Sequence, residues 1–189
     1  ATVDNPAIDP EEIEVAKKEV GSIIFTQEYL AEFVDNGQSI VKPEWINYYA
    51  KNEDGLWQGG AGKWDPLELQ HFGAADIAVT TSESSDYTAI IDFAKHSDGT
   101  LFVNDVKRIK VEGPDIVPQI TEMYKRYNWS HVLLEKVGLS KTVSQMLIRE
   151  GYRVQELPAD KDKITKALPL SARMESGDVL LKAEAPWLP

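Results

Sequence analysis

The sequence contains no cysteine, which excludes disulfide bonds and thiolate metal sites. Its three histidines, His71, His96 and His131, lie far apart in the chain, so a histidine-rich zinc site is not expected. No apolar run approaches the ~18 residues of a membrane span, and the N-terminus lacks the basic-then-apolar pattern of a secretory signal. These absences predict a protein without a membrane segment, in which oxygen atoms would hold any metal ion.

Hydrophobic residues make up 42% and charged residues 27% of the 189 residues, a balance typical of a packed globular domain. The net charge of −11 is at first sight unfavourable for nucleic-acid binding, which needs lysine and arginine. Residues 1–65, however, carry 13 acidic and 5 basic residues, whereas residues 66–189 carry 18 and 15. The acidity therefore lies mainly in the first third of the chain, and net charge alone does not decide the function.

Residues 1–65 are predicted to form an N-terminal connector segment. Residues 10–34 have the apolar spacing of a helix, with a proline and two glutamates at its start. A second, aromatic helix is expected over residues 43–50. Residues 52–64 contain four glycines and no regular periodicity, which predicts a loop or linker.

Residues 66–189 have the alternating pattern of an α/β domain. Strands are expected over residues 73–79, 87–94, 101–109, 129–134, 152–157 and 178–181. Helices are expected over residues 114–127, 140–150 and 160–174. Three strands joined by tight turns, one of them at Asp98-Gly99, are followed by alternating helices and strands. This order predicts a mixed sheet flanked by helices.

Three acidic residues near strand ends are candidates for chemistry. Asp76 falls within the apolar strand predicted over residues 73–79, where a charge is costly unless it is paired or bound to a cation. Glu135 follows an apolar run, and Asp86 directly precedes the second predicted strand. Each also has an ordinary interpretation: a strand boundary misplaced by one or two residues, a surface acid at a strand end, and the polar start of a strand.

Whether Asp76 and Glu135 converge depends on the order of the strands. If the first and fourth strands are adjacent and parallel, their C-terminal ends form a crevice in which the two carboxylates face each other. Like charges a few Å apart repel unless a divalent cation compensates, and Mg²⁺ or Mn²⁺ suits oxygen ligands. Two such ions would activate a water and stabilise the leaving oxygen of a phosphodiester. The spacing alone does not establish that the carboxylates meet.

Several segments resemble the nuclease half of the large terminase subunits of tailed bacteriophages. Residues 76–89, which end in Ser85-Asp86-Tyr87-Thr88-Ala89, resemble their first nuclease motif. Leu133-Leu134-Glu135 and the following glycine-containing loop resemble the second acidic motif. Residues 161–179 are similar to the segment that follows, and the helix over 16–33 is similar to the region that joins the motor and nuclease halves. The resemblance covers most of residues 12–188.

This resemblance implies a ribonuclease H-like fold and Mg²⁺- or Mn²⁺-dependent cleavage of double-stranded, concatemeric viral DNA during genome packaging. By the matching positions, Asp76 and Glu135 would be metal ligands and Asp86 a nearby catalytic acid. The implied partners are DNA, the portal, the small terminase subunit and the ATPase half of the same protein. The implied location is the cytoplasm of an infected bacterial host cell.

The chain departs from the family pattern in two places. It contains no phosphate-binding loop of the form G-x-x-x-x-G-K-[ST], so ATP-driven translocation is not expected of it. The family's third catalytic acid is expected beyond residues 185–188, which predicts a nuclease domain over 66–189 that is truncated at its C-terminus.

Four basic residues are candidates for contacts with DNA phosphates: Lys107, Arg108, Lys110 and Lys141. A solvated charged surface is the alternative interpretation of each. Two alternatives for the whole chain also stay open. One is another ribonuclease H-like nuclease of the resolvase or integrase type, and the other is a catalytically silent docking module of the packaging motor.

Overall fold

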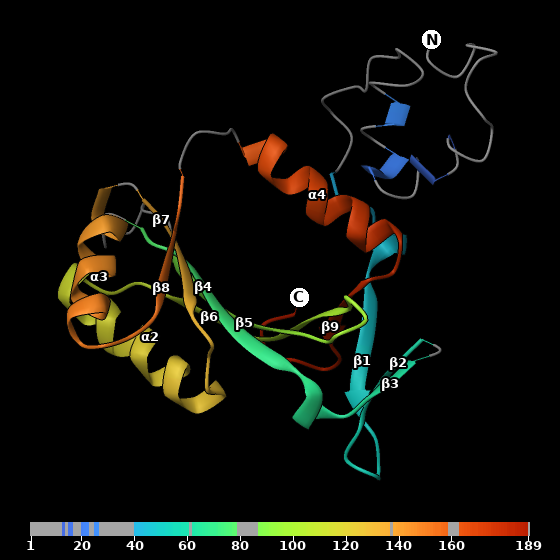
Figure 1. Ribbon diagram of the computed structural model, residues 1–189, viewed down its shortest axis with the longest axis horizontal. Coiled ribbons are helices and arrows are strands. Elements are labelled where there is room, and N and C mark those ends of the chain that lie inside the picture. The colour runs from blue at the N-terminus through green and yellow to red at the C-terminus, as the bar shows by residue number, and fades with distance from the viewer. Residues whose placement is uncertain are drawn as a thin grey trace. The chain divides into compact units, whose positions relative to one another are not determined.

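A computed structural model describes residues 13, 15–16, 20–22, 25–26, 40–60, 62–78, 87–136, 138–158 and 163–188. Figure 1 shows the elements of the chain, coloured by residue number. The chain divides into two compact units. The first comprises residues 1–47 and 161–180, and the second comprises residues 48–160 and 181–189. The division predicted from the sequence, into a connector over residues 1–65 and a nuclease domain over residues 66–189, stays a prediction. No helix of the described part is long and apolar enough to cross a membrane.

The predicted N-terminal helix agrees with the described residues between 13 and 26, all of which are helical. Two other predictions for this region are wrong. Instead of a helix over 43–50, the chain forms the short 3-10 helix η2 (Pro43–Trp45) and the strand β1 (Asn47–Lys51). Instead of a loop over 52–64, it forms the antiparallel strands β2 (Trp57–Gly59) and β3 (Gly62–Trp64).

Tertiary aromatic packing explains why these short strands form. Tyr49 of β1 is buried, stacks on Trp57 with ring centroids 4.6 Å apart, and meets Phe102 edge-on at 5.1 Å. Trp64 of β3 packs against the same phenyl ring at 5.0 Å. Such aromatic pairs stabilise the strands beyond simple burial, and local periodicity carries no signal of them because the partners are distant in sequence.

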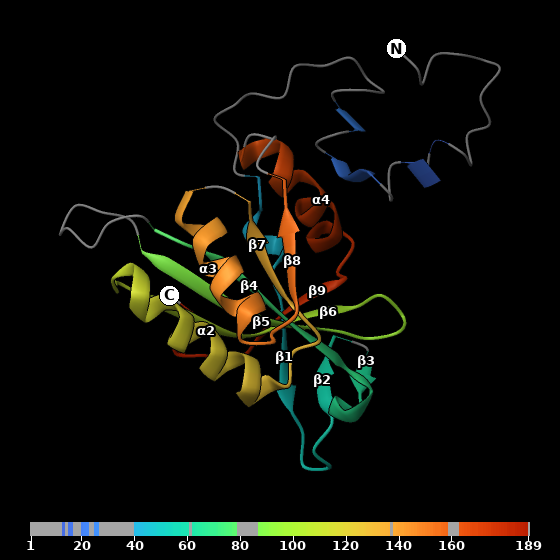
Figure 2. The same ribbon diagram turned by 60° about the vertical axis from the view of Figure 1, so that its left-hand side comes forward.

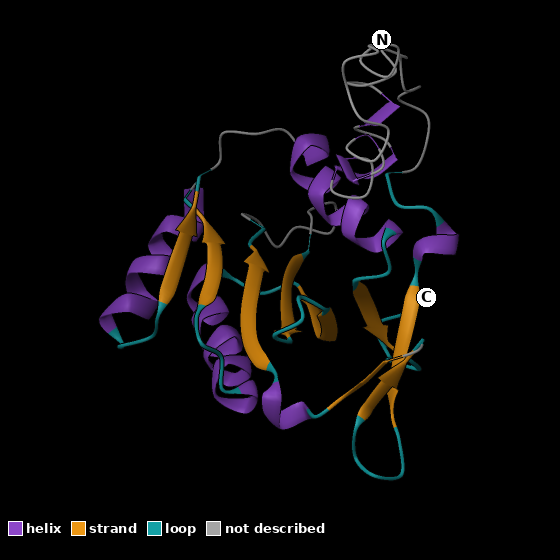
Figure 3. Ribbon diagram, turned by 45° about the vertical axis from the view of Figure 1, so that its right-hand side comes forward, coloured by secondary structure: helices purple, strands orange, loops and turns teal. Residues whose placement is uncertain are grey.

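The nine strands of the described part form one sheet in the order β3-β2-β1-β9-β6-β5-β4-β7-β8. Figure 3 draws the strands in orange and the helices in purple. The longest strands of the sheet are β4 (Gln70–Asp76), β5 (Thr88–Lys95) and β6 (Leu101–Ile109), which pair antiparallel in sequence order. The strands β7 (Val132–Glu135) and β8 (Val154–Leu157) follow, with β7 parallel to β4 and β8 parallel to β7. The prediction of a mixed sheet is confirmed.

The helices α2 (Gly113–Tyr127) and α3 (Gly138–Arg149) lie side by side on one face of this sheet (Figure 2). Asn128, at φ 50°, caps α2 in the left-handed conformation that asparagine tolerates. The helix α4 (Lys163–Glu175) and the strand β9 (Val179–Lys182) complete the predicted alternation, and the short helix η3 (Pro66–Glu68) precedes β4.

The main core lies between the sheet and the two helices α2 and α3. Its fully buried members come from both helices and from two strands: Ile116, Ile120 and Met123 of α2, Val143 and Leu147 of α3, Ile90 of β5, and Val132 and Leu134 of β7. We call the sheet face that carries α2 and α3 the helix face, and the other side the second face. Because side chains alternate along a strand, each strand residue can be assigned to one of the two faces.

Candidate metal and DNA site

Asp76 is the last residue of β4 and its side chain is exposed. The prediction that it lies within an apolar strand over 73–79 is wrong, because the strand begins three residues earlier and ends at the aspartate. The neighbours Ala75 and Ile77 both pack with the core of the helix face. Alternation therefore directs Asp76 to the second face of the sheet, at the C-terminal end of β4.

Glu135 is the last residue of β7 and is half-buried. β4 and β7 pair in parallel, and their last registered pairs are Ala74 with Leu133 and Ala75 with Leu134. One step further along both strands brings Asp76 level with Glu135, on neighbouring strands about 4.8 Å apart and on the same face. The condition that the sequence left open, that these two strands are adjacent and parallel, is confirmed. Asp86 lies outside the described residues.

The two carboxylates present only oxygen donors. Within the described residues, no group of three or more His, Asp or Glu side chains could hold a metal ion. Two carboxylates at one edge of a sheet fit a hard divalent cation that completes its coordination with water or with substrate oxygens. They do not fit a zinc site of the closed structural type, which needs four protein ligands.

Two of the four candidate basic residues lie on the second face together with the carboxylates. Ala89 of β5 pairs with Asp76 on one side and with Arg108 of β6 on the other. Arg108 is therefore level with Asp76, two strands or about 10 Å across the sheet, and its side chain is exposed. Lys110 follows two residues later, and both cations lie against the ring of Tyr87, at 3.8 and 4.8 Å from the ring centroid.

Lys107 has a different position. It pairs with the buried Ile90, which places its side chain on the helix face. There its Nζ lies 2.9 Å from the carboxylate of Glu122 on α2. This ion pair lowers the pKa of Glu122, through the hydrogen bond from Lys107 above all.

Lys141 is exposed on α3, the helix that begins three residues after Glu135. Its charge also acts on Glu156 of β8. The pKa of Glu156 is lowered mainly by the hydrogen bond from Lys136, which lies 3.0 Å away, then by the hydroxyl of Ser144, and further by the charge of Lys141. Lys136 and Lys141 thus lie near the C-terminal ends of β7 and β8, where Glu156 compensates the charge of Lys136.

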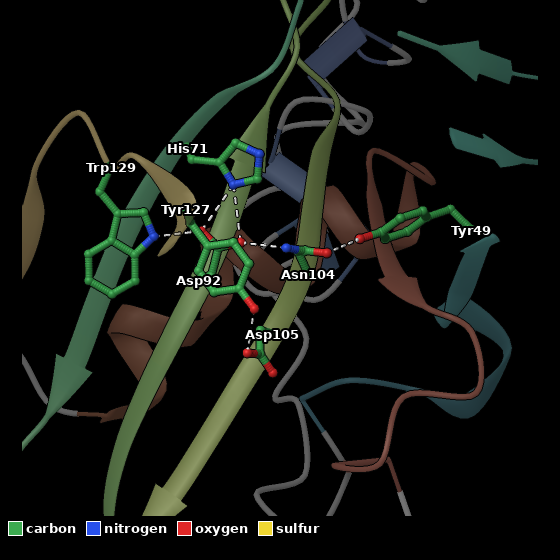
Figure 4. Close-up of polar contacts among 7 residues, drawn as sticks. All are labelled: Tyr49, His71, Asp92, Asn104, Asp105, Tyr127 and Trp129. Atoms are coloured by element: carbon green, nitrogen blue, oxygen red, sulfur yellow. Dashed lines mark hydrogen bonds and ion pairs between the residues drawn. The ribbon is translucent and has the colours of Figure 1, made fainter. Parts of the chain in front are cut away.

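A buried polar cluster that the sequence reading missed lies nearer the other end of these strands (Figure 4). The carboxylate of Asp92 on β5 has no exposed surface and receives three donors. Trp129 Nε1 donates at 2.6 Å, Asn104 Nδ2 at 2.7 Å, and His71 Nδ1 lies 3.0 Å away. Tyr49 extends the cluster by donating to Asn104 at 3.2 Å.

This cluster joins β1, β4, β5, β6 and the segment before β7 through one fully hydrogen-bonded carboxylate. Nearby, Tyr127 donates to Asp105 at 2.7 Å, and burial together with this contact raises the pKa of Tyr127 to about 12. Burial also raises the pKa of Tyr49, with the charge of Asp92 adding to the effect. We assign this cluster a structural role. A buried carboxylate depends on all of its hydrogen-bond donors, because removing any one of them leaves its charge uncompensated. The sequence held one signal of this cluster: Asp92 is an acidic residue on the core side of the alternating strand 88–95.

A cavity of about 550 Å³ lies at this same end of the sheet, lined by the start of β4, the segment before β7 and Arg153. His71 and Trp129 form part of its wall. Asp76 and Glu135 lie at the opposite ends of β4 and β7. The candidate site therefore lies at the C-terminal ends of β4 and β7 and not in this cavity.

A mixed sheet with this strand order, two helices on one face and two carboxylates at adjacent parallel strand ends defines a ribonuclease H-like α/β domain. The model of the terminase RNaseH-like domain family matches residues 73–189, more than half of the chain. The chain belongs to this family, and the resemblance noted in the sequence is confirmed. No curated protein sequence matches the chain.

Solved structures support the fold. The large terminase of a thermophilic bacteriophage aligns with 97% of this chain at a TM-score of 0.67 and 10% identity. The chain spans only 43% of that protein. The large terminase nuclease of a second thermophilic phage, G20c, solved with bound magnesium, aligns with 79% of this chain and 77% of its own length. The TM-score is 0.53 and the identity 15%, and the same nuclease with bound cobalt gives the same values.

Proposed function

We propose that this chain is a divalent-metal-dependent endonuclease that cuts double-stranded DNA. The observation that carries the proposal is the parallel register of β4 and β7, which brings Asp76 level with Glu135 on the second face. Membership of the terminase RNaseH-like domain family supports nuclease chemistry. The similar G20c nuclease was solved with bound zinc, magnesium or cobalt, which supports a divalent cation here.

In this proposal Asp76 and Glu135 hold Mg²⁺ or Mn²⁺, and Asp86 is a nearby catalytic acid. Two ions held there supply an activated water and stabilise the charge on the leaving oxygen of the phosphodiester. The carboxylates would bind the cation at the strand ends, which is where the reacting phosphate lies in this proposal. Without a bound cation, the two negative charges of Asp76 and Glu135 would repel each other and the DNA.

The neighbouring cations would hold the rest of the DNA strand. Arg108 and Lys110 lie on the same face as the carboxylates, and Lys141 lies on the helix that follows Glu135. We assign the phosphate contacts to these three residues. Lys107, the fourth candidate, is held by Glu122 on the other face and contributes less in this assignment.

The wider role follows from the family. We propose that the chain is the cutting part of a phage DNA-packaging machine and that its substrate is concatemeric viral DNA in the cytoplasm of the infected bacterium. Its partners would be the portal, the small terminase subunit and an ATPase part of the same protein.

Nicking of supercoiled plasmid DNA in the presence of Mg²⁺ or Mn²⁺ tests the catalytic proposal. Asp76→Asn and Glu135→Gln each keep the size of the side chain and remove its charge. Loss of several kcal/mol of transition-state stabilisation predicts a decrease of about 10²- to 10³-fold in the nicking rate. Asp54→Asn and Glu150→Gln change exposed acids away from the strand ends and serve as matched controls with the parent rate.

Each result has a definite meaning. Loss of nicking in both site variants, with parent rates in both controls, supports the site. Equal nicking by the parent, Asp76→Asn and Glu135→Gln would overturn the site assignment. A folded parent that binds DNA but does not nick it with either metal would overturn the nuclease proposal and favour a docking module.

A further inference from the structure

Tyr87 is the feature of the second face that the proposed function does not use. It directly precedes β5 and is 44% exposed. Arg108 Cζ lies 3.8 Å from the ring centroid and Lys110 Nζ lies 4.8 Å from it. Both distances are in the range of cation–π contacts, and the closer one suits a guanidinium stacked on an aromatic ring.

The register of the sheet explains how one ring meets two cations. Thr88 pairs with Ile109, and both side chains belong to the helix face. Tyr87 and the two basic residues on either side of Ile109 therefore share the second face. Like charges repel, and a ring that attracts both cations offsets part of this repulsion.

An aromatic ring differs from a carboxylate in one respect that matters here. Glu122 pairs with Lys107, and Glu156 pairs with Lys136, so in both cases the cation's charge is compensated. The ring of Tyr87 has no net charge and attracts cations only through its quadrupole. The contact with Tyr87 therefore restricts the positions of Arg108 and Lys110 without itself neutralising their charges.

We propose that Tyr87 is a positioning residue that holds Arg108 and Lys110 together as a doubly charged clamp for a DNA phosphate beside the carboxylates. Within the clamp, Arg108 is level with Asp76, two strands away on the same face, and Lys110 lies two residues further along the chain. A DNA strand whose reacting phosphate lies at Asp76 and Glu135 passes the clamp with a neighbouring phosphate. The inference rests on the proposed function and adds to it a residue that selects the path of the strand.

The test measures binding of a fluorescent duplex oligonucleotide by anisotropy, at several salt concentrations and with a chelator present so that no cleavage occurs. Tyr87→Leu removes the aromatic face and is expected to weaken binding about five- to tenfold at ~0.1 M salt. It should also reduce the slope of log K against log salt by about 1, which corresponds to one lost phosphate contact. Tyr87→Phe keeps the ring and should bind like the parent.

Two further variants separate positioning from a general effect on folding. Tyr48→Leu changes a tyrosine of similar exposure, 48%, on β1 and should leave binding unchanged. In an Arg108→Gln, Lys110→Gln background, Tyr87→Leu should cause no further loss, because the charges that it positions are absent. With Mg²⁺ or Mn²⁺ present, Tyr87→Leu should raise KM for plasmid nicking and leave kcat close to the parent value.

Parent-like affinity and salt dependence of Tyr87→Leu would overturn the clamp, as would equal losses in Tyr87→Phe and Tyr87→Leu. Absence of duplex binding by the folded parent would overturn it as well. Binding that depends on Tyr87 in a parent that cannot nick DNA would support the clamp while the nuclease proposal fails. Nicking that depends on Asp76 but not on Tyr87 would leave the nuclease proposal in place and refute the clamp.

Discussion

Replacement of Trp129 by phenylalanine removes one of three donors from the buried carboxylate of Asp92. The lost hydrogen bond is 2.6 Å long, and its acceptor has no exposed surface. A hydrogen bond to a charged group contributes about 1.5–3 kcal/mol, and the unfilled space left by the smaller ring costs about 1 kcal/mol more. We therefore expect Trp129→Phe to lower the free energy of unfolding by about 2–4 kcal/mol.

Trp64→Phe provides the matched control, because it is the same chemical change at an exposed hydrogen bond. Trp64 Nε1 donates to Asp98 at 3.0 Å, and Asp98 also accepts from the backbone of Thr100. Water can replace the lost donor there, so the expected cost is below about 1 kcal/mol. Urea unfolding followed by circular dichroism measures both values, and their difference isolates the effect of burial.

Equal destabilisation by the two variants would refute the argument that the cluster around Asp92 is a buried structural element. A second readout links this prediction to function. Because Asp92 lies away from the strand ends that carry Asp76 and Glu135, folded Trp129→Phe should keep the parent nicking rate. Loss of nicking in a variant shown to be folded would mean that the cluster takes part in the chemistry and that the site assignment is wrong.

Two more predictions concern local structure. A Cβ on residue 73 would clash with the ring of Trp129, so Gly73→Ala should lower the free energy of unfolding by about 1–3 kcal/mol. An effect below about 0.5 kcal/mol in urea unfolding would show that the ring moves aside freely. The pKa of His96 is raised, chiefly by its hydrogen bond to Asp98, so its stabilising effect is complete below its ordinary value of about 6.5 and is lost as the pH rises through the raised pKa. An NMR titration should show a lower pKa for His96 in Asp98→Asn than in the parent, and an unchanged value would contradict this cause.

Much of the fold was predictable because it depends on local patterns. The strands around residues 88–95 and 101–109 alternate in polarity, and Asp98-Gly99 joins them in the turn expected of that dipeptide. The helices α2 and α3 follow from apolar spacing together with a proline at the start of the first and a glycine after the end of the second. The N-terminal strands β1 to β3 were not predictable, since they depend on aromatic contacts with Phe102, which is distant in sequence.

The candidate site divides in the same way. The sequence by itself determined that Asp76 and Glu135 each adjoin apolar residues of a predicted strand and that a basic group lies around the end of the strand 101–109, but it placed Asp76 within its strand and not at the strand end. Only the tertiary structure decided that β4 and β7 are parallel neighbours, because strand pairing depends on contacts between distant segments. It also separated Arg108 from Lys107, since a shift of one residue along a strand moves a side chain from one face of the sheet to the other.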